Sequence, residues 1–174
     1  MANPVGEWFD RGNAFLLMGR YEEAIKCYNK VIKIKPNWAS VWAGKGHALM
    51  LLGKYKDAIE CFDKSLRINS QDVNTWTMKG LALSELGQRD KAIRCYEEAI
   101  KINPQNTLPW KAKGSALGLL GKDDEAIPNF NRAIEINQND GEAWYGKGIA
   151  LQALHRDAEA EVAFAKAKEL GHTG

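Results

Sequence analysis

The chain has 174 residues, of which 45% are hydrophobic and 26% charged, and its 24 basic and 22 acidic residues give a net charge of +2. This balance is far from the strongly basic composition typical of nucleic-acid-binding domains. No hydrophobic run approaches the roughly 18 residues of a membrane-spanning helix. The first residues show no basic leader and no apolar stretch, so we expect a cytoplasmic protein without a signal peptide and without a membrane partner.

A repeat of 34 residues runs through the chain, and its most visible marks are the tryptophans Trp8, Trp42, Trp76, Trp110 and Trp144. Small residues keep the same interval, namely Gly12, Gly46, Gly80, Gly114, Gly148, Ala24, Ala58, Ala92, Ala126 and Ala160. A second aromatic series follows it, at Tyr28, Phe62, Tyr96, Phe130 and Phe164. A period of this length is typical of a solenoid that stacks one supersecondary unit. We therefore expect one domain over residues 1–174, with repeats at about 5–38, 39–72, 73–106, 107–140 and 141–174.

Each repeat is predicted to form two helices. In the first repeat, Trp8, Gly12 and Phe15 share one face of a helix from about Gly6 to Met18. Gly19 ends this helix, and a second helix follows over Tyr21–Ile34 until Pro36 closes the unit. The glycine and alanine series would let the helices approach closely. The tryptophan series is predicted to belong to the core, whereas Trp38 lies off the pattern and is expected to be partly exposed.

Three departures from the repeat carry further expectations. Pro128 falls inside the second helix of the fourth repeat, where Asp123 is expected to be the N-cap, and it predicts a kink or a frayed start. His155 replaces the turn glycine of the fifth repeat. Val162 leaves the last helix with a half-apolar face, which is compatible with self-association or with a covering partner.

Cysteines occur at one repeat position only, as Cys27, Cys61 and Cys95. Equivalent positions in stacked helices lie about 10 Å apart, which is too far for a disulfide. Their spacing does not suit metal ligands either. We therefore expect small buried apolar side chains in a reducing compartment, and no metal or cofactor.

The recurring unit Trp-x3-Gly-x2-aromatic or Leu-x3-Gly-x4-Ala-x3-aromatic resembles the tetratricopeptide repeat (TPR) family over residues 5–174. The resemblance implies an all-α fold, an α-solenoid of antiparallel helix pairs that forms a right-handed superhelix with a concave groove lined by first helices. It also implies a scaffold or adaptor that binds a peptide or a helix of another protein.

Carried over position by position, the family pattern places a ligand groove on the first helix of every repeat. The candidate groove residues are Phe9, Asn13, Leu16, Leu17, Ala43, His47, Met50, Leu51, Thr77, Met78, Leu81, Lys111, Ser115, Tyr145 and Ile149. The same pattern also includes Asp10, Gly44, Ser84, Glu85, Ala112, Gly118, Leu119, Gly146, Gln152 and Ala153. The amino-terminal part of this set is apolar and rich in methionine, which suits an amphipathic partner helix. Packing between first helices is the alternative explanation for some of these side chains.

A chaperone-type carboxylate clamp is not expected. The clamp needs Lys, Asn, Asn, Lys and Arg at five defined groove positions. When these positions are counted from the first repeat, only Asn13 has the required residue type. Its other positions hold Phe9, Gly44, Asn74 and Met78.

Other function classes remain as alternatives to the scaffold. A basic series at Arg11, Lys45, Lys79, Lys113 and Lys147 would allow binding of nucleic acid, although a solvated edge with charges paired to nearby acids is the favoured explanation. A self-assembling structural protein, with a homo-oligomer formed through the terminal repeats or the groove, is the other alternative. An enzyme is not expected, because the three histidines lie apart and accompany no nucleophile.

Overall fold

The computed structural model describes residues 4–172, and this part of the chain forms ten helices and no strand. None of these helices is long and apolar enough to cross a membrane. Contacts divide the chain into two compact units, residues 1–87 and residues 88–174.

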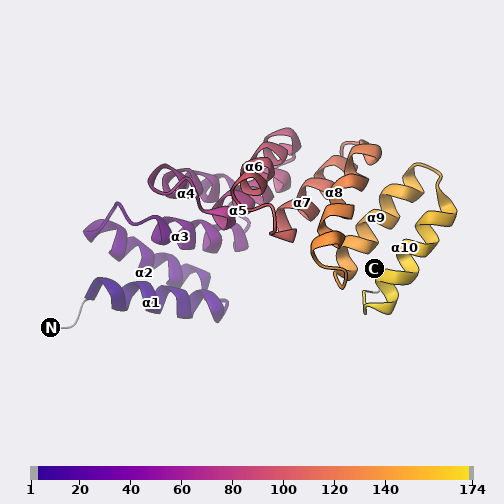
Figure 1. Ribbon diagram of the computed structural model, residues 1–174. Helices are drawn as coiled ribbons and strands as arrows, with labels where there is room; N and C mark the ends of the chain where they lie inside the picture. Colours follow the sequence, from indigo (N-terminus) through magenta and orange to yellow (C-terminus); the bar gives the residue numbers. More distant parts are fainter. Residues whose placement is uncertain (1–3, 173–174) are drawn as a thin grey trace. The chain divides into compact units, whose positions relative to one another are not determined.

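The first unit contains α1 (Pro4–Leu17), α2 (Tyr21–Ile34), α3 (Ala39–Leu51), α4 (Tyr55–Ile68) and α5 (Val73–Glu85). Each helix packs on the next, and α3 also contacts both α1 and α5 (Figure 1). The bounds of α2 are those predicted from the sequence, and α1 begins two residues earlier than expected.

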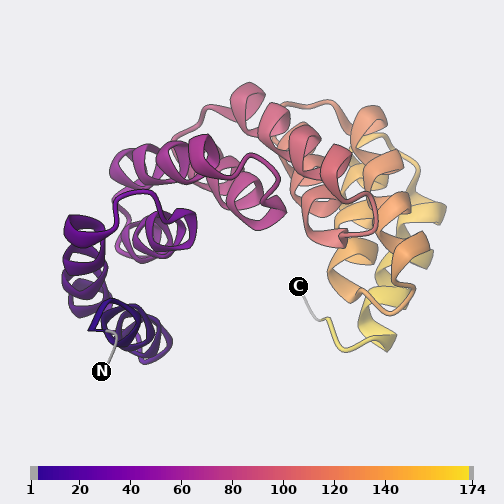
Figure 2. The same cartoon turned by 60° about the vertical axis from the view of Figure 1, so that its left-hand side comes forward.

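The second unit contains α6 (Arg89–Ile102), α7 (Thr107–Gly118), α8 (Asp123–Ile136), α9 (Gly141–Ala153) and α10 (Asp157–Glu169). These helices also pack in chain order, and α7 contacts α9 directly. In Figure 2 they run from magenta to yellow, and the last four form adjacent hairpins. The predicted antiparallel helix pairs are confirmed within each unit.

Short turns with a left-handed residue join the two helices of a repeat. Gly19, Gly53 and Gly121 have φ angles of 73°, 72° and 71°. Glycine adopts this conformation without steric penalty, because it has no Cβ atom. His155 occupies the same place in the fifth repeat with a φ of 56°, and it is the one non-glycine residue of the described chain with a positive φ. The turn geometry is therefore kept where the sequence departs from glycine.

In the first, second, fourth and fifth repeats, the packing joins a glycine of the first helix to an aromatic ring of the second. A methyl group added at Gly12 would lie 2.7 Å from the Tyr28 ring, and one at Gly46 would lie 2.6 Å from Phe62. These distances are too short for carbon atoms, so no larger residue fits without displacement. Ala24 and Tyr28 are fully buried beside this contact. The predicted close approach of small and aromatic residues is confirmed.

The tryptophans lie at the edge of the core, and the prediction of core burial is wrong in degree. All five are half-buried, and four of them pack against the buried clusters, namely Trp8, Trp42, Trp110 and Trp144. In the last four tryptophans of the series, the indole N–H donates to a backbone carbonyl oxygen of the turn between two repeats. Trp42 donates to Pro36 (2.7 Å), Trp76 to Ser70 (2.9 Å), Trp110 to Pro104 (3.0 Å) and Trp144 to Gln138 (3.1 Å). The indole N–H, a polar group, explains the partial exposure.

Trp38 is partly exposed, as predicted, and its ring lies 4.6 Å from the ring of Phe9. The three cysteines are buried, which confirms their expected role as small core side chains. Burial raises the pKa of the Cys27 and Cys61 thiols.

Helix α8 corrects two expectations. It begins at Asp123, the same repeat position at which α2, α4 and α6 begin, so the frayed start predicted from Pro128 is wrong. The N-cap is Lys122 and not Asp123, which is the first helical residue. An acidic residue in the first turn still stabilises the helix, because it faces the positive end of the helix dipole. A kink at Pro128 stays a prediction.

Replacement of His155 by glycine tests the strain in the fifth turn. We expect His155→Gly to raise the free energy of unfolding by about 0.5–1 kcal/mol. The left-handed conformation costs residues other than glycine roughly 1–2 kcal/mol, and the substitution removes this cost. Part of the stabilisation is lost because glycine also increases the conformational entropy of the unfolded chain. Urea unfolding followed by circular dichroism measures the difference. The control is Gly121→Ala, which should destabilise although its added methyl group meets no atom within 4 Å. A His155→Gly variant less stable than the natural chain would show that His155 is not strained in this turn.

Replacement of Trp42 by phenylalanine tests the indole hydrogen bond. Trp42→Phe keeps most of the ring contact but loses the donor to the Pro36 carbonyl, so we expect a loss of about 1–2 kcal/mol in unfolding free energy. Trp38→Phe is the matched control, since the Trp38 indole donates no hydrogen bond within residues 4–172. Equal losses in the two variants would show that the hydrogen bond contributes nothing.

Candidate binding groove

The predicted groove residues of the first unit lie on α1, α3 and α5, and most of them are half-buried. This group contains Phe9, Asn13, Leu16, Ala43, His47, Met50, Met78 and Leu81. Leu17 and Leu51 are exposed at the ends of α1 and α3, with Leu17 at 89% of its maximal area. Thr77 is buried, and its hydroxyl donates to the Val73 carbonyl over 2.8 Å. The pattern therefore selected residues with very different access to solvent.

Packing contacts occupy several of these side chains. The Phe9 ring lies 6.2 Å from Tyr28 as well as 4.6 Å from Trp38. The Tyr28 hydroxyl donates to Asn13 Oδ1 over 2.8 Å, and burial raises the pKa of Tyr28 to about 12. Burial also lowers the pKa of His47. In the first unit, packing between helices thus accounts for much of the predicted apolar lining.

Met50 and Met78 also pack against a core cluster, the one that contains Phe62. Leu16 packs against the cluster around Tyr28. These side chains fill the space between first helices and leave Leu17 and Leu51 as the exposed apolar positions.

In the second unit, Lys111 is engaged by acidic side chains. Its Nζ lies 3.0 Å from Asp140 Oδ2 and 2.6 Å from Glu142 Oε2, and its side chain is 13% exposed. Burial acts to lower the pKa of Lys111, but the hydrogen bonds to Glu142 and Asp140 outweigh it and raise the pKa. Asp140 also caps α9 by accepting from the Ala143 N–H, so Lys111 links α7 to the start of α9.

Tyr145 belongs to an aromatic cluster at the carboxy-terminal end of the described chain. Its ring lies 5.4 Å from Phe164 and 4.8 Å from His172. These contacts join α9 to α10 and to the segment that follows α10, so Tyr145 acts mainly in packing.

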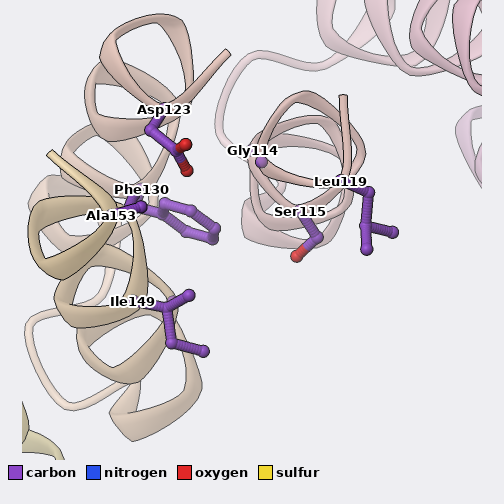
Figure 3. Close-up of a pocket in the computed structure, with 10 residues that line it drawn as sticks. Gly114, Ser115, Leu119, Asp123, Phe130, Ile149 and Ala153 are labelled. Atoms are coloured by element: carbon purple, nitrogen blue, oxygen red, sulfur yellow. The ribbon is translucent and has the colours of Figure 1, made fainter. Parts of the chain in front are cut away.

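The remaining two candidates of this unit, Ser115 and Ile149, are brought together around a hollow between α7 and α9 (Figure 3). We call this hollow the α7–α9 pocket. It has a volume of about 390 Å³ and is lined by Gly114, Ser115, Gly118, Leu119, Asp123, Phe130, Gly146, Ile149, Ala150 and Ala153. Volumes of this size are within the range of ligand sites, which start near 300 Å³.

The floor of the α7–α9 pocket is Phe130 of α8, whose ring points toward α7 in Figure 3. A methyl group at Gly114 would lie 3.0 Å from this ring, and one at Gly146 only 2.5 Å away. The two glycines thus hold the backbones of α7 and α9 against opposite parts of one ring. Ile149, which is 49% exposed, faces the same space from α9.

Asp123 is the one charged residue of the pocket lining, and its carboxylate points into the pocket in Figure 3. Sequence reasoning assigned Asp123 to a helix cap and Phe130 to the core, and so missed both as lining residues. No sequence signal singles out Asp123, because the third and fifth repeats also hold a charged residue at this position, Arg89 and Asp157.

The basic series is largely engaged by neighbouring groups. Lys79 pairs with Asp63 over 2.6 Å, and Lys113 pairs with Glu97 over 2.8 Å. Arg11, Lys45 and Lys147 lie 5.3–5.7 Å from the ring centroid of the tryptophan three residues earlier. Cations at such distances are attracted by the ring face. The surroundings of the series therefore favour the charge-pairing explanation over a nucleic-acid surface.

Comparisons with known proteins agree with this architecture. Residues 7–37, 39–72, 73–106 and 110–140 match models of the tetratricopeptide repeat. No curated protein matches the chain.

Solved structures give similar folds. A crystal structure of MamA protein is 25% identical, covers 98% of this chain and 93% of its own, and has a TM-score of 0.86. A MamA structure from Desulfovibrio magneticus RS-1, from residue 41 to the end, is 20% identical, covers 98% and 97%, and has a TM-score of 0.88. YrrB, described as a TPR protein with an unusual peptide-binding site, is 23% identical, covers 94% and 84%, and has a TM-score of 0.77.

The resemblance seen in the sequence is thus confirmed by four matched segments and by the fold. The pair α9–α10 lies beyond the matched segments, but α9 and α10 begin 34 residues after α7 and α8, at Gly141 and Asp157. The chain belongs to the tetratricopeptide repeat family.

Proposed function

We propose that this protein is a non-enzymatic scaffold or adaptor that binds a peptide or helix of another protein on the exposed face of its first helices. The observation that carries the proposal is the α7–α9 pocket, which is open and mainly apolar, and six of whose ten lining residues are predicted groove positions. Family membership supports a role in protein interaction. The proposal treats the five repeats as one interaction domain.

The lining chemistry supports binding of a protein segment over a polar small molecule. Of the ten lining residues, only Ser115 and Asp123 have polar side chains. Apolar pockets with one or two convergent polar groups typically take an apolar anchor and orient it. A carboxylate-clamp mode is not part of the proposal, because Phe9 and Met78 stand at two of its basic positions and both pack in the core.

Two alternative functions remain, and the peptide selection described below distinguishes them from the scaffold. Nucleic-acid binding would use the basic series, whose members lie beside acidic or aromatic groups. Self-assembly would use exposed apolar positions such as Val162 on α10, which is 67% exposed. The buried cysteines suit a reducing compartment, so a cytoplasmic location is part of the proposal.

Selection of binding peptides tests the proposal. We expect a library of random 12-residue peptides, panned against the full chain, to yield sequences with a shared pattern. The peptides should shift the NMR signals of Ser115 and Ile149. Ile149→Arg should weaken binding about tenfold or more, because a charge replaces an apolar contact at the centre of the site. Val162→Arg is the matched control, since it makes the same change at an exposed branched residue outside the pocket.

Three results would contradict the scaffold proposal. The first is a selection without any shared pattern. The second is salt-dependent binding of single-stranded RNA through the basic series, which would favour the nucleic-acid alternative. The third is a molar mass that rises with concentration in light scattering together with shifts at Ser115 and Ile149, which would show that a second copy occupies the groove.

A further inference from the structure

The α7–α9 pocket lies at repeat positions where the first two repeats have two large side chains that the fourth repeat lacks. Leu16 and Met50 stand where the fourth repeat has Gly118, and Tyr21 and Tyr55 stand where it has Asp123. Ala153 similarly replaces Leu51, which stands at the end of α3.

These larger residues pack against the core in the first unit. Leu16 and Tyr21 contact the cluster around Tyr28, and Met50 and Tyr55 contact the cluster around Phe62. In the second unit, which lacks these side chains, the Phe130 ring lines the pocket between Gly114 and Gly146, although Phe130 as a whole is only 4% exposed. The substitutions therefore turn a filled position of the repeat into a hollow with an aromatic floor.

Asp123 adds a charge to this apolar hollow. Its carboxylate has no ion pair and no hydrogen bond with any residue of the described chain. The neighbouring Lys122 lies near Glu125 instead, at 3.8 Å. Asp123 is half-buried, and no cation is among the lining residues. A carboxylate that is partly removed from water is stabilised most by a cationic partner that also donates a hydrogen bond to it.

We propose, building on the scaffold function above, that the α7–α9 pocket binds a partner segment in which a large apolar side chain adjoins a lysine or arginine. The apolar side chain lies on Phe130 between Gly118 and Ile149. The neighbouring cation reaches the Asp123 carboxylate. The volume of about 390 Å³ accommodates one large side chain with its flanking chain atoms.

A fragment probe tests this chemistry without knowledge of the partner. Phenethylammonium carries an aromatic ring and a cation two carbons apart, and 2-phenylethanol is its neutral counterpart. Each is titrated into the isotope-labelled full chain and followed by NMR. We expect both to shift the amide signals of Gly114, Gly146 and Ile149. The cation should bind about two to five times more tightly, as for a partly exposed ion pair.

Two substitutions separate the two parts of the pocket. Gly118→Leu restores the side chain of the first repeat and should abolish binding of both probes. It should fold normally, because a methyl group at Gly118 meets Asp123 Oδ1 at an ordinary 3.5 Å. Asp123→Asn should leave 2-phenylethanol binding unchanged and remove the preference for the cation. Ala153→Leu provides a second filled pocket if Gly118→Leu alters the circular dichroism spectrum.

Matched controls are available at the same positions of the fifth repeat. Gln152→Leu corresponds to Gly118→Leu, and Asp157→Asn corresponds to Asp123→Asn, and neither residue lines the pocket. Both controls should bind the two probes as the natural chain does.

The pocket assignment is overturned if neither probe shifts these signals, if the filled variants still bind, or if Asp123→Asn keeps the preference for the cation. The pocket assignment is also wrong if the selected peptides lack an apolar–basic pair and bind the Gly118→Leu variant equally well. The scaffold function would still hold in that case. If the probes bind as expected but no peptide is selected, the scaffold function fails and the pocket chemistry stands.

Discussion

In four of the five repeats, a contact between an aromatic ring of the second helix and a glycine of the first helix determines how closely the two helices pack. Tyr28 lies against Gly12 of its own repeat and against Gly44 of the next repeat, and Phe130 lies in the same way against Gly114 and Gly146. One ring therefore fixes two first helices at a distance that only glycine permits. The turns with left-handed glycines and the indole hydrogen bonds to the inter-repeat carbonyls complete the unit, but they depend on this spacing.

The same contact explains where a binding site can arise. The ring at this position has one side toward the gap between consecutive first helices, and that side is covered wherever the neighbouring side chains are large. Leu16 and Tyr21 provide such cover in the first repeat, and Met50 and Tyr55 in the second. Gly118 and Asp123 do not, and in the fourth repeat the ring lines a pocket while it stays largely buried. Under the proposed function, binding therefore depends on which repeat positions lack a large side chain over the ring.

Much of the fold could be predicted from the sequence because a fixed period constrains every repeat at once. The bounds of α2, the turn at Gly19 and the burial of Cys27 and Tyr28 followed from spacing and residue size alone. The errors concern local competition. The Trp42 indole lies at the core edge, where its N–H donates to a turn carbonyl, and α8 begins at the usual repeat position despite Pro128.

The site was less predictable, since the family pattern gives the positions of groove residues but not which neighbouring side chains bury them. Thr77 and Lys111 occupy groove positions, yet Thr77 is buried and Lys111 is held by Asp140 and Glu142. Ser115 and Ile149 occupy another position of the groove pattern, five residues after the tryptophan, and they do line a pocket. The difference depends on neighbours from other helices, whose proximity only the three-dimensional structure shows.

Two glycine substitutions measured together test the ring-on-glycine contact most directly. Gly146→Ala places a methyl group 2.5 Å from the Phe130 ring, so we predict a loss of about 1–3 kcal/mol in the free energy of unfolding from the forced displacement. Gly118→Ala, on the neighbouring first helix, has room for its methyl group and should gain up to about 1 kcal/mol from helix propensity. Stabilisation by both substitutions in urea unfolding would contradict this packing, because it would show that the Phe130 ring does not hold α9 at glycine distance.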